Sequence, residues 1–426
     1  MPSTIQDPMQ LVALDGRTLE EHRRDFPVLE RRLNGRKYCY LNPTATSLKP
    51  SIIAEAMRDY YLYDAVSAAK GADGFSHAVA ARFAASRNQI AKFIGASDRH
   101  CIIFTRGATS ALNMICYGLE QTWVESGDEV VVSDQEHHAN YVPWQQLCLR
   151  KNLKLCIVKS LPNGSVDMDD LRSLLNAKTK IVALAHQTNV MGARNPIAEI
   201  ATLVHEKSPA VFVVDGAQGI VHERVNVEAM DIDFYAFSAH KLFGPTGLGV
   251  FYGKRELLER IPPIELGGEM IGTVDRYDSS FAELPSKFEA GTMPAAEVLG
   301  FKVALDYVEN TIGFDIIQEA TAAVSSYALD GLLKIPGIEI YNAENVAQSG
   351  IISFNVKGVH PHDAASVYDH AGIALRAGHH CAQRCMAWLG QKSTLRASFS
   401  FYNTFHDADR LIACSKRAGD FLDILF

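Results

Sequence analysis

One stretch constrains the fold more than any other part of the sequence: an apolar run that ends in Ser238, His240 and Lys241. A loop with three glycines and a proline follows, and a second apolar run, residues 250–252, comes after it. Such a run is typical of a strand buried on both faces of a sheet. Burial disfavours the charge of a lysine at the strand end, so the position favours a neutral amine.

A neutral lysine amine forms imines with aldehydes. Ser238 and His240 beside it suit a phosphate group, and the glycines of the loop allow the backbone to approach a ligand closely. An aldehyde and a phosphate together indicate pyridoxal phosphate (PLP). The alternative interpretation of Lys241 is a solvated lysine at the end of a strand.

Another apolar run, residues 210–215, lies upstream of this stretch and ends in Asp215. Open α/β sheets bind ligands at the carboxyl ends of their strands. An aspartate there can pair with a pyridinium nitrogen and keep it protonated, which makes the ring an electron sink. A helix N-cap is the alternative role for Asp215. Two buried strands that end in aspartate and lysine, in this order, favour PLP.

Three further strands, predicted at residues 100–104, 128–134 and 180–186, also end in candidate contacts. The first opens into a helix, and free N–H groups at a helix N-terminus bind anions, so we interpret Ala108 and Thr109 as phosphate contacts. A plain capped turn is the alternative. His137 can lie flat on a planar ring, although a structural hydrogen bond is the commoner role of a histidine. Asn189 can hydrogen-bond a ring hydroxyl.

Strands and helices alternate between residues 100 and 254, which predicts a doubly wound α/β fold with a mostly parallel sheet. The pattern changes after Gly291, where helices are predicted at 295–310, 314–333, 362–370 and 415–426, and strands at 350–356 and 395–401. Nearer the N-terminus we predict helices at 18–27, 52–63 and 78–94, a strand at 38–41 and a loop at 66–76. The predicted division is a large PLP-binding α/β domain, 30–294, and a small α+β domain, 1–29 with 295–426.

Composition excludes several classes of function. A net charge of −8 and a pI near 6.0 argue against general nucleic-acid binding. No apolar stretch reaches the roughly 18 residues of a membrane span, and the first residues do not resemble a signal peptide. The eight cysteines are scattered, which fits the reducing cytoplasm better than a disulfide framework. Cys381 and Cys385 lack a second pair of ligands at matching spacing, so no metal site is expected.

Eight motifs in order carry a family resemblance. They are Glu-His-His-Ala-Asn at 136–140 with Pro143 and Trp144, Asn-Val-Met-Gly at 189–192, Asp-Gly-Ala-Gln at 215–218, Ser-Ala-His-Lys-Leu-Phe-Gly-Pro-Thr-Gly at 238–247, Gly-Glu-Met-Ile at 268–271, Phe-Glu-Ala-Gly-Thr at 288–292, Arg-Ala-Gly-His-His-Cys-Ala at 376–382 and Arg-Ala-Ser-Phe at 396–399. From about residue 20 onward the chain resembles the SUF-type (group II) cysteine desulfurases, which are related to selenocysteine lyases, within the class V, fold-type I PLP enzymes.

The resemblance implies a role for each candidate residue. Residues that hold PLP would be Lys241 through a covalent imine, Asp215 at the ring nitrogen, Gln218 and Asn189 at the ring hydroxyl, His137 stacked on the ring, and Ala108, Thr109, Ser238 and His240 at the phosphate. Thr292 would reach the phosphate of a neighbouring subunit, which implies a homodimer with shared active sites. Arg396 would bind the substrate carboxylate, and Arg376 would shape that site. Cys381 would be the nucleophile, with its thiolate favoured by cationic histidines beside it.

The implied activity converts L-cysteine to L-alanine, leaves a persulfide on Cys381 and supplies sulfur to an acceptor for iron–sulfur clusters or thiolation. The alternatives are a C–S lyase that acts on an S-substituted cysteine, a selenocysteine lyase and, from another class, a non-catalytic sulfur carrier. Four stretches depart from the family pattern on the substrate side: 42–44, 67–73, Leu266 and Arg384. They leave the substrate open.

Overall fold

A computed structural model describes residues 7–67 and 71–420 of the chain. Its largest sheet has seven strands in the order β4-β10-β9-β8-β7-β5-β6. All run parallel except β10, which pairs antiparallel with both β9 and β4. The strands are β4 (Ile102–Thr105), β5 (Glu129–Ser133), β6 (Lys154–Val158), β7 (Thr179–Ala185), β8 (Val211–Asp215), β9 (Phe234–Ser238) and β10 (Gly249–Gly253).

Strand β10 runs antiparallel because its connection to β9 is short. Only residues 239–248 separate the two strands, and a parallel neighbour would need a crossover of a dozen or more residues. Gly249 opens β10 at a point where a Cβ atom would lie 2.3 Å from the Gly107 Cα atom. The glycine therefore lets β10 pass directly beside the loop that follows β4.

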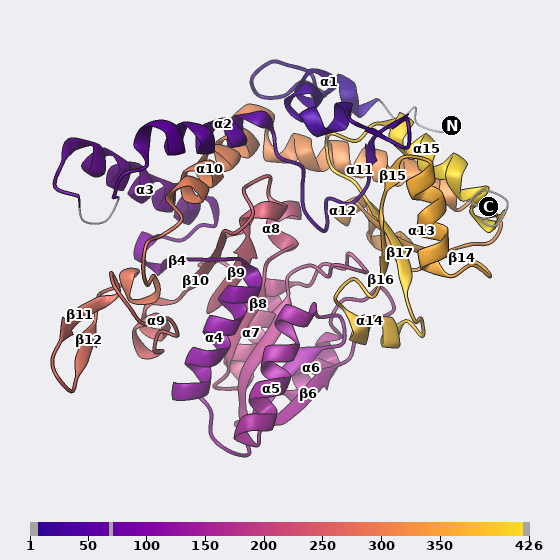
Figure 1. Ribbon diagram of the computed structural model, residues 1–426. Coiled ribbons are helices and arrows are strands. Elements are labelled where there is room, and N and C mark those ends of the chain that lie inside the picture. Colours follow the sequence, from indigo (N-terminus) through magenta and orange to yellow (C-terminus); the bar gives the residue numbers. More distant parts are fainter. Residues whose placement is uncertain (1–6, 68–70, 421–426) are drawn as a thin grey trace.

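Helices cover both faces of this sheet, and in Figure 1 α4 and α5 lie in front of it. Strands β8, β9 and β10 are buried along their whole length. This arrangement confirms the predicted doubly wound, mostly parallel α/β fold. The helices of this region are α3 (Gly74–Phe93), α4 (Ala108–Thr122), α5 (Val142–Lys151), α6 (Met168–Leu174), α7 (Ile197–Lys207), α8 (Gly219–His222) and α9 (Arg255–Arg260).

A second sheet lies to the right of the first in Figure 1 and has its own apolar core. Its antiparallel strands follow the order β13 (Ile338–Ile340), β14 (Ile351–Val356), β17 (Thr394–Ser398), β16 (Arg376–Gly378). The helices of the C-terminal part are α10 (Ala295–Asp306), α11 (Phe314–Leu332), α12 (Val346–Ser349), α13 (Pro361–His370), α14 (Gln383–Trp388) and α15 (Phe405–Ser415). Helices α10 and α11, α13 and strand β14 confirm the sequence prediction. The domain boundary at residue 295 stays a prediction.

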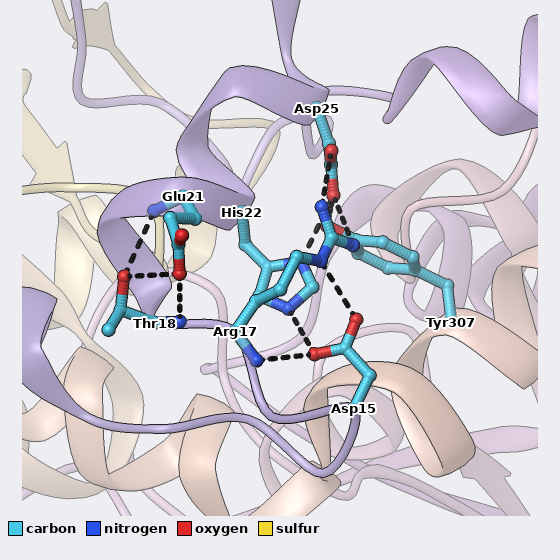
Figure 2. Close-up of polar contacts among 7 residues, drawn as sticks. All are labelled: Asp15, Arg17, Thr18, Glu21, His22, Asp25 and Tyr307. Atoms are coloured by element: carbon cyan, nitrogen blue, oxygen red, sulfur yellow. Dashed lines mark hydrogen bonds and ion pairs between the residues drawn. The ribbon is translucent and has the colours of Figure 1, made fainter.

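The N-terminal segment joins both regions. Strand β3 (Cys39–Tyr40) pairs parallel with β15 (Ile373–Ala374). It confirms the strand predicted at 38–41. Figure 2 shows the polar cluster that anchors the preceding helix, α1 (Leu19–His22). Both ring nitrogens of the buried His22 lie 3.0 Å from a carboxylate, Asp25 on one side and Asp15 on the other. The hydroxyl of Tyr307 donates to Asp25 as well.

Two predicted helix limits were wrong. Helix α3 begins at Gly74, inside the predicted loop, because the Asp73 carboxylate caps it by accepting from the N–H groups of Phe75 and Ser76. The predicted helix at 415–426 is displaced: α15 ends at Ser415, and its start is fixed by a capping box between Thr404 and Asp407. The end of that prediction, residues 421–426, lies outside the described residues, as do residues 1–6 and 68–70.

The remaining elements are short. Helix α2 (Ser51–Asp59) continues into a π-helical turn, Tyr60–Asp64, as the prediction at 52–63 indicated. Two hairpins, β1 (Arg32–Leu33) with β2 (Arg36–Lys37) and β11 (Ile271–Val274) with β12 (Ser279–Phe281), were not predicted. The second projects from the large sheet in Figure 1. Within the described ranges, every helix is too short or too polar to span a bilayer.

Candidate active site

The candidate residues of the large sheet gather at one edge. Strands β4, β5, β7, β8 and β9 run in the same direction, so their carboxyl ends meet there. Each end is followed by a residue that the sequence singled out: Thr109 after β4, His137 after β5, Asn189 after β7, Asp215 at the end of β8 and Lys241 after β9. Five separate stretches of sequence are therefore brought to one place by the sheet topology.

Lys241 and Asp215 form the electrostatic centre of this edge. Burial lowers the pKa of Lys241 to about 8, against an opposing effect of the Asp215 carboxylate. Burial raises the pKa of Asp215, and Lys241 acts in the opposite direction. The N–H group of Ala217 donates to the Asp215 carboxylate at 3.0 Å and fixes its orientation. A lysine with a pKa near 8 has a substantial neutral fraction at neutral pH, which is the form that reacts with an aldehyde.

The start of α4 forms a cradle for an anion. The Ala108 N–H group donates to the Ser238 hydroxyl at 2.8 Å, so the two predicted phosphate contacts touch each other. Gly107, at a φ of 155°, lets the chain turn into the helix with no side chain over its N-terminus. Thr109 is exposed on the first turn and lines a cleft of about 600 Å³ together with His137 and Cys381. The helix dipole favours an anion at this position.

His137 is partly buried and lines the same cleft. Its Nδ1 atom accepts from the Ala139 N–H group at 3.1 Å. Burial and the cation of Lys241 lower the pKa of His137 to about 3. The imidazole is therefore neutral at physiological pH, and a neutral ring can lie against an aromatic ligand or exchange a proton with it.

Two arginines of the small sheet face this edge. Arg376 and Arg396 sit opposite each other in the register of β16 and β17. Arg396 is 1% exposed, and its Nη1 atom donates to the Asn189 main-chain oxygen at 2.7 Å. Its Nε atom has no partner among the described residues. Burial and the neighbouring Arg376 lower the pKa of Arg396 to about 9. A buried guanidinium with an unpaired N–H group can donate that group to a carboxylate.

Cys381 lies next to Arg376, whose Nη2 atom is 3.2 Å from the Cys381 Sγ atom. The thiol is half-buried in the cleft, and both His380 and Cys381 have positive φ angles, 54° and 57°. The expectation of cationic histidines fails for His380. Burial and the cation of Arg396 lower its pKa to about 2, so its ring is neutral. The cation in contact with the sulfur is the Arg376 guanidinium.

Gln218 and His240 make contacts that the sequence did not predict. The Gln218 amide donates to the Thr44 main-chain oxygen at 2.9 Å. The His240 main-chain oxygen accepts from the Lys49 ammonium at 2.8 Å. Burial lowers the pKa of Lys49 to about 7 and that of His240 to about 4. The ring of His240 is thus neutral, and any contact with a phosphate would be a neutral hydrogen bond.

Thr292 does not lie with the other candidates. It is exposed and lines a different cleft, of about 350 Å³, beside Arg87 and Glu289. Glu289 and Arg87 form a buried ion pair at 2.7 Å that fixes the loop before Thr292. Within one chain, Thr292 and Thr109 therefore belong to separate surfaces.

Two of the departures from the family pattern now have a structural context. Asn42 faces Arg396, with its Oδ1 atom 3.5 Å from a guanidinium nitrogen. Arg384 pairs with Asp134 at 2.9 Å and ties α14 to the end of β5. Part of the segment 67–73 lies outside the described residues, and Leu266 is exposed.

The residues present fit the chemistry of PLP. A buried acceptor, the Asn189 Oδ1 atom, has no partner among the described residues and matches a ring hydroxyl. The Asp215 carboxyl matches a ring nitrogen, and the α4 cradle matches a phosphate. The free Nε atom of Arg396 remains for the substrate.

Sequence reasoning missed two residues of this region. Glu136 is a buried acid directly before His137, and it was noted only as part of a motif. Lys49 supports the turn that carries Lys241, and no local pattern marks it. The unusual feature of Glu136, an acid between an apolar strand and two histidines, was a signal that could have identified it.

Comparison with known proteins agrees with this geometry. The aminotransferase class-V family model matches residues 39–411. Proteins named probable cysteine desulfurase, from Staphylococcus epidermidis and Staphylococcus aureus, are each 43% identical over 95% of this chain and 97% of their own. The cysteine desulfurase CsdA from Escherichia coli superposes with a TM-score of 0.86 at 36% identity, covering 95% of this chain and 98% of that one. A cysteine desulfurase from Thermococcus onnurineus gives 0.88 at 33% identity, covering 93% and 97%.

The family match spans most of the chain, and the relatives align over nearly all of it. In this chain the adjacent parallel strands β8 and β9 lead at their carboxyl ends to Asp215 and Lys241. The chain belongs to the aminotransferase class-V family.

Proposed function

We propose that the protein is a PLP-dependent cysteine desulfurase of the SUF type, which converts L-cysteine to L-alanine and leaves the sulfur as a persulfide on Cys381. The observation that carries this proposal is the Cys381 Sγ atom 3.2 Å from the Arg376 guanidinium, in the cleft that His137 lines. The names of the relatives, cysteine desulfurase and probable cysteine desulfurase, support it.

Residues at the strand ends would hold PLP. Lys241 would carry it as an imine, Asp215 would pair with the ring nitrogen, and Asn189 and Gln218 would contact the ring hydroxyl. Ala108, Thr109, Ser238 and His240 would surround the phosphate, and His137 would lie on the ring. When bound, PLP supplies an electron sink for the carbanion formed at the substrate α-carbon.

The chain's own residues perform the remaining work. Arg396 binds the substrate carboxylate through its free Nε atom, which fixes the α-carbon relative to Lys241. After the substrate amine displaces it, Lys241 is a free amine with a pKa of about 8 and takes the α-proton. Return of a proton to the α-carbon later completes L-alanine.

Sulfur transfer uses Cys381. Its thiolate, beside the Arg376 cation, attacks the sulfur of the substrate, so an S–S bond forms and the C–S bond breaks. The electron pair of the C–S bond stays on the carbon side and is protonated. The substrate carbon is reduced and the Cys381 sulfur is oxidised to the persulfide, so the step needs no external oxidant.

A second candidate is a C–S lyase that acts on an S-substituted cysteine. The observation that favours it is the open cleft at Cys381, about 600 Å³, into which a substituent on the substrate sulfur could extend. Such an elimination needs Lys241 but no nucleophilic thiol.

One experiment separates the two candidates. The protein is incubated with L-cysteine or with S-ethyl cysteine, and the products and the mass of the Cys381 peptide are measured after a single turnover. Desulfuration gives alanine and a mass gain of one sulfur on Cys381, and Cys381→Ser loses both. Pyruvate formed from S-ethyl cysteine, with turnover retained in Cys381→Ser, would replace the desulfurase by the lyase.

The partners and location are part of the same proposal. A homodimer with shared sites is supported by the separation of Thr292 from Thr109 within one chain. A sulfur-acceptor protein would meet the persulfide at the open cleft. A cytoplasmic location is supported by eight free cysteines. The proposed domains remain 30–294 and 1–29 with 295–426.

A further inference from the structure

Glu136 is a buried acid at the active-site edge for which the proposed chemistry has no use. Its side chain is 1% exposed and lies in the turn between β5 and α5. The Ser133 hydroxyl is 2.7 Å from one carboxyl oxygen, and the Asn140 amide nitrogen donates to the other at 2.6 Å. An isolated buried carboxyl costs several kcal/mol, and hydrogen bonds are what make its retention possible.

The orientation of Asn140 is fixed by a third group. Its Oδ1 atom accepts from the indole N–H group of Trp144 at 3.1 Å, so its amide nitrogen must face Glu136. The Ser133 hydroxyl in turn accepts from the Gln135 N–H group at 3.1 Å. The polar chain from Ser133 through Glu136 and Asn140 to Trp144 therefore has a defined donor and acceptor at each link.

These hydrogen bonds hold the turn that contains His137. The imidazole follows Glu136 directly, and the next residue, His138, donates its N–H group to the Cys381 main-chain oxygen at 2.7 Å. The turn thus supports both the ring that would lie on PLP and the loop that carries the nucleophile.

The Glu136 carboxyl is mostly neutral at neutral pH. Burial is the main cause that raises its pKa, to about 8, and the Asp215 carboxylate acts in the same direction, while Asn140, Ser133 and the Ala185 N–H group act against both. A neutral acid needs no buried counter-ion, so its hydrogen bonds are what fix its place in the turn.

We propose that Glu136 is a positioning residue for His137: its hydrogen bonds with Ser133 and Asn140 hold the turn that presents the imidazole to the cofactor site. The inference rests on the proposed function only in taking His137 as a residue that contacts PLP. It does not depend on whether cysteine is the substrate.

The test compares two substitutions at position 136. In Glu136→Gln the amide can turn so that its oxygen accepts from the Asn140 amide and its nitrogen donates to the Ser133 hydroxyl, so this conservative variant keeps the hydrogen bonds. In Glu136→Met the side chain has a similar length but no strong acceptor, so the Asn140 amide nitrogen is left unpaired.

Two readouts test the positioning role. The first is the Tm of the protein without PLP: it falls by a few °C in Glu136→Met, because the Asn140 donor is left unpaired, and stays near the wild-type value in Glu136→Gln. The second is the visible circular dichroism of the PLP-loaded protein, which depends on how the ring is held: the band weakens in Glu136→Met and is kept in Glu136→Gln.

Asp407→Asn is the matched control, because it removes another buried carboxyl, in the capping box of α15, and leaves the visible circular dichroism unchanged. A circular dichroism band that stays at the wild-type intensity in Glu136→Met, or that is lost equally in Glu136→Gln, would overturn the positioning role. Both readouts are independent of alanine formation, so failure of the desulfurase proposal would leave them interpretable.

Discussion

Arg396 illustrates how a single residue can reveal a binding site. Its guanidinium is buried at the point where the two sheets meet and is held by the Asn189 main-chain oxygen at 2.7 Å. Asn42, not a carboxylate, is its other neighbour, at 3.5 Å. A buried cation without a carboxylate is costly, so the free Nε atom points to an anionic ligand that supplies the missing charge.

Arg396→Lys tests this role. An ammonium is a point charge and cannot reproduce two parallel N–H bonds to a carboxylate, so KM for the amino-acid substrate should rise about 10- to 100-fold, or about 1.4–2.7 kcal/mol of binding free energy. The turnover number should change less. Steady-state kinetics measure both values. Arg255→Lys, on the surface beside Asp98, is the control and should leave KM unchanged. An unaltered KM in Arg396→Lys would move the carboxylate site to Arg376.

Single residues at strand ends were predictable, but contacts across the two sheets were not. Asp215 and Lys241 end apolar runs, and that local pattern is enough to place them at the carboxyl edge. The contact of Arg376 with Cys381 depends on the fold of the loop after β16, where two residues take positive φ angles. No local pattern indicated that an arginine, in place of a histidine, faces the sulfur.

At the scale of elements, the buried strands were predicted well because burial on both faces leaves a continuous apolar run. Helix limits were less predictable, because capping decides them. Gly74 begins α3 despite the low helix propensity of glycine, since the Asp73 carboxylate pairs two otherwise free N–H groups. The displaced helix at the C-terminus has the same cause, the capping box at Thr404.

The junction of α7 with β9 makes stability depend on pH. His205, in the last turn of α7, contacts Asp233 at 2.9 Å and Asp231 at 2.8 Å. The hydrogen bond to Asp233 is the main cause that raises the pKa of His205. A raised pKa means that the stabilisation is complete below the unfolded pKa of about 6.5 and is lost as the pH rises through the folded value.

His205→Gln should therefore lower the free energy of unfolding by about 0.5–1 kcal/mol at pH 5.5 and change it little at pH 9. Urea unfolding at the two pH values measures this difference. His406→Gln, which changes an exposed histidine on α15, should have no such effect. An equal loss at both pH values would mean that His205 contributes packing and not charge.

At the scale of the whole molecule, several large apolar side chains are exposed on two elements that the Arg82–Asp64 ion pair joins. The π-helical turn after α2 and the first turn of α3 expose Tyr63 and Phe75 to 73% and 70%, with Tyr61 and Leu62 beside them. Exposed patches of this kind mark interaction surfaces. The cleft that contains Thr292 adjoins them through Tyr60 and Val66. A second copy of the chain on these elements would bury the patch and bring Thr292 toward another active site.

Shared sites predict that two inactive variants restore each other's activity. Lys241→Ala removes the imine lysine, and Thr292→Asp places a negative charge where the partner's phosphate would bind, so each variant alone should be inactive. In a mixed dimer, the chain with an intact Lys241 receives an intact Thr292 from the other chain, which gives one complete site. Half of the dimers are mixed when the two are co-expressed equally, so activity should recover to about one quarter of the wild-type value. Lys241→Ala co-expressed with Asp215→Asn is the control, since both changes affect the same set of strand ends and the mixed dimer has no complete site. Recovery in neither mixture would show that Thr292 serves its own chain or no site at all.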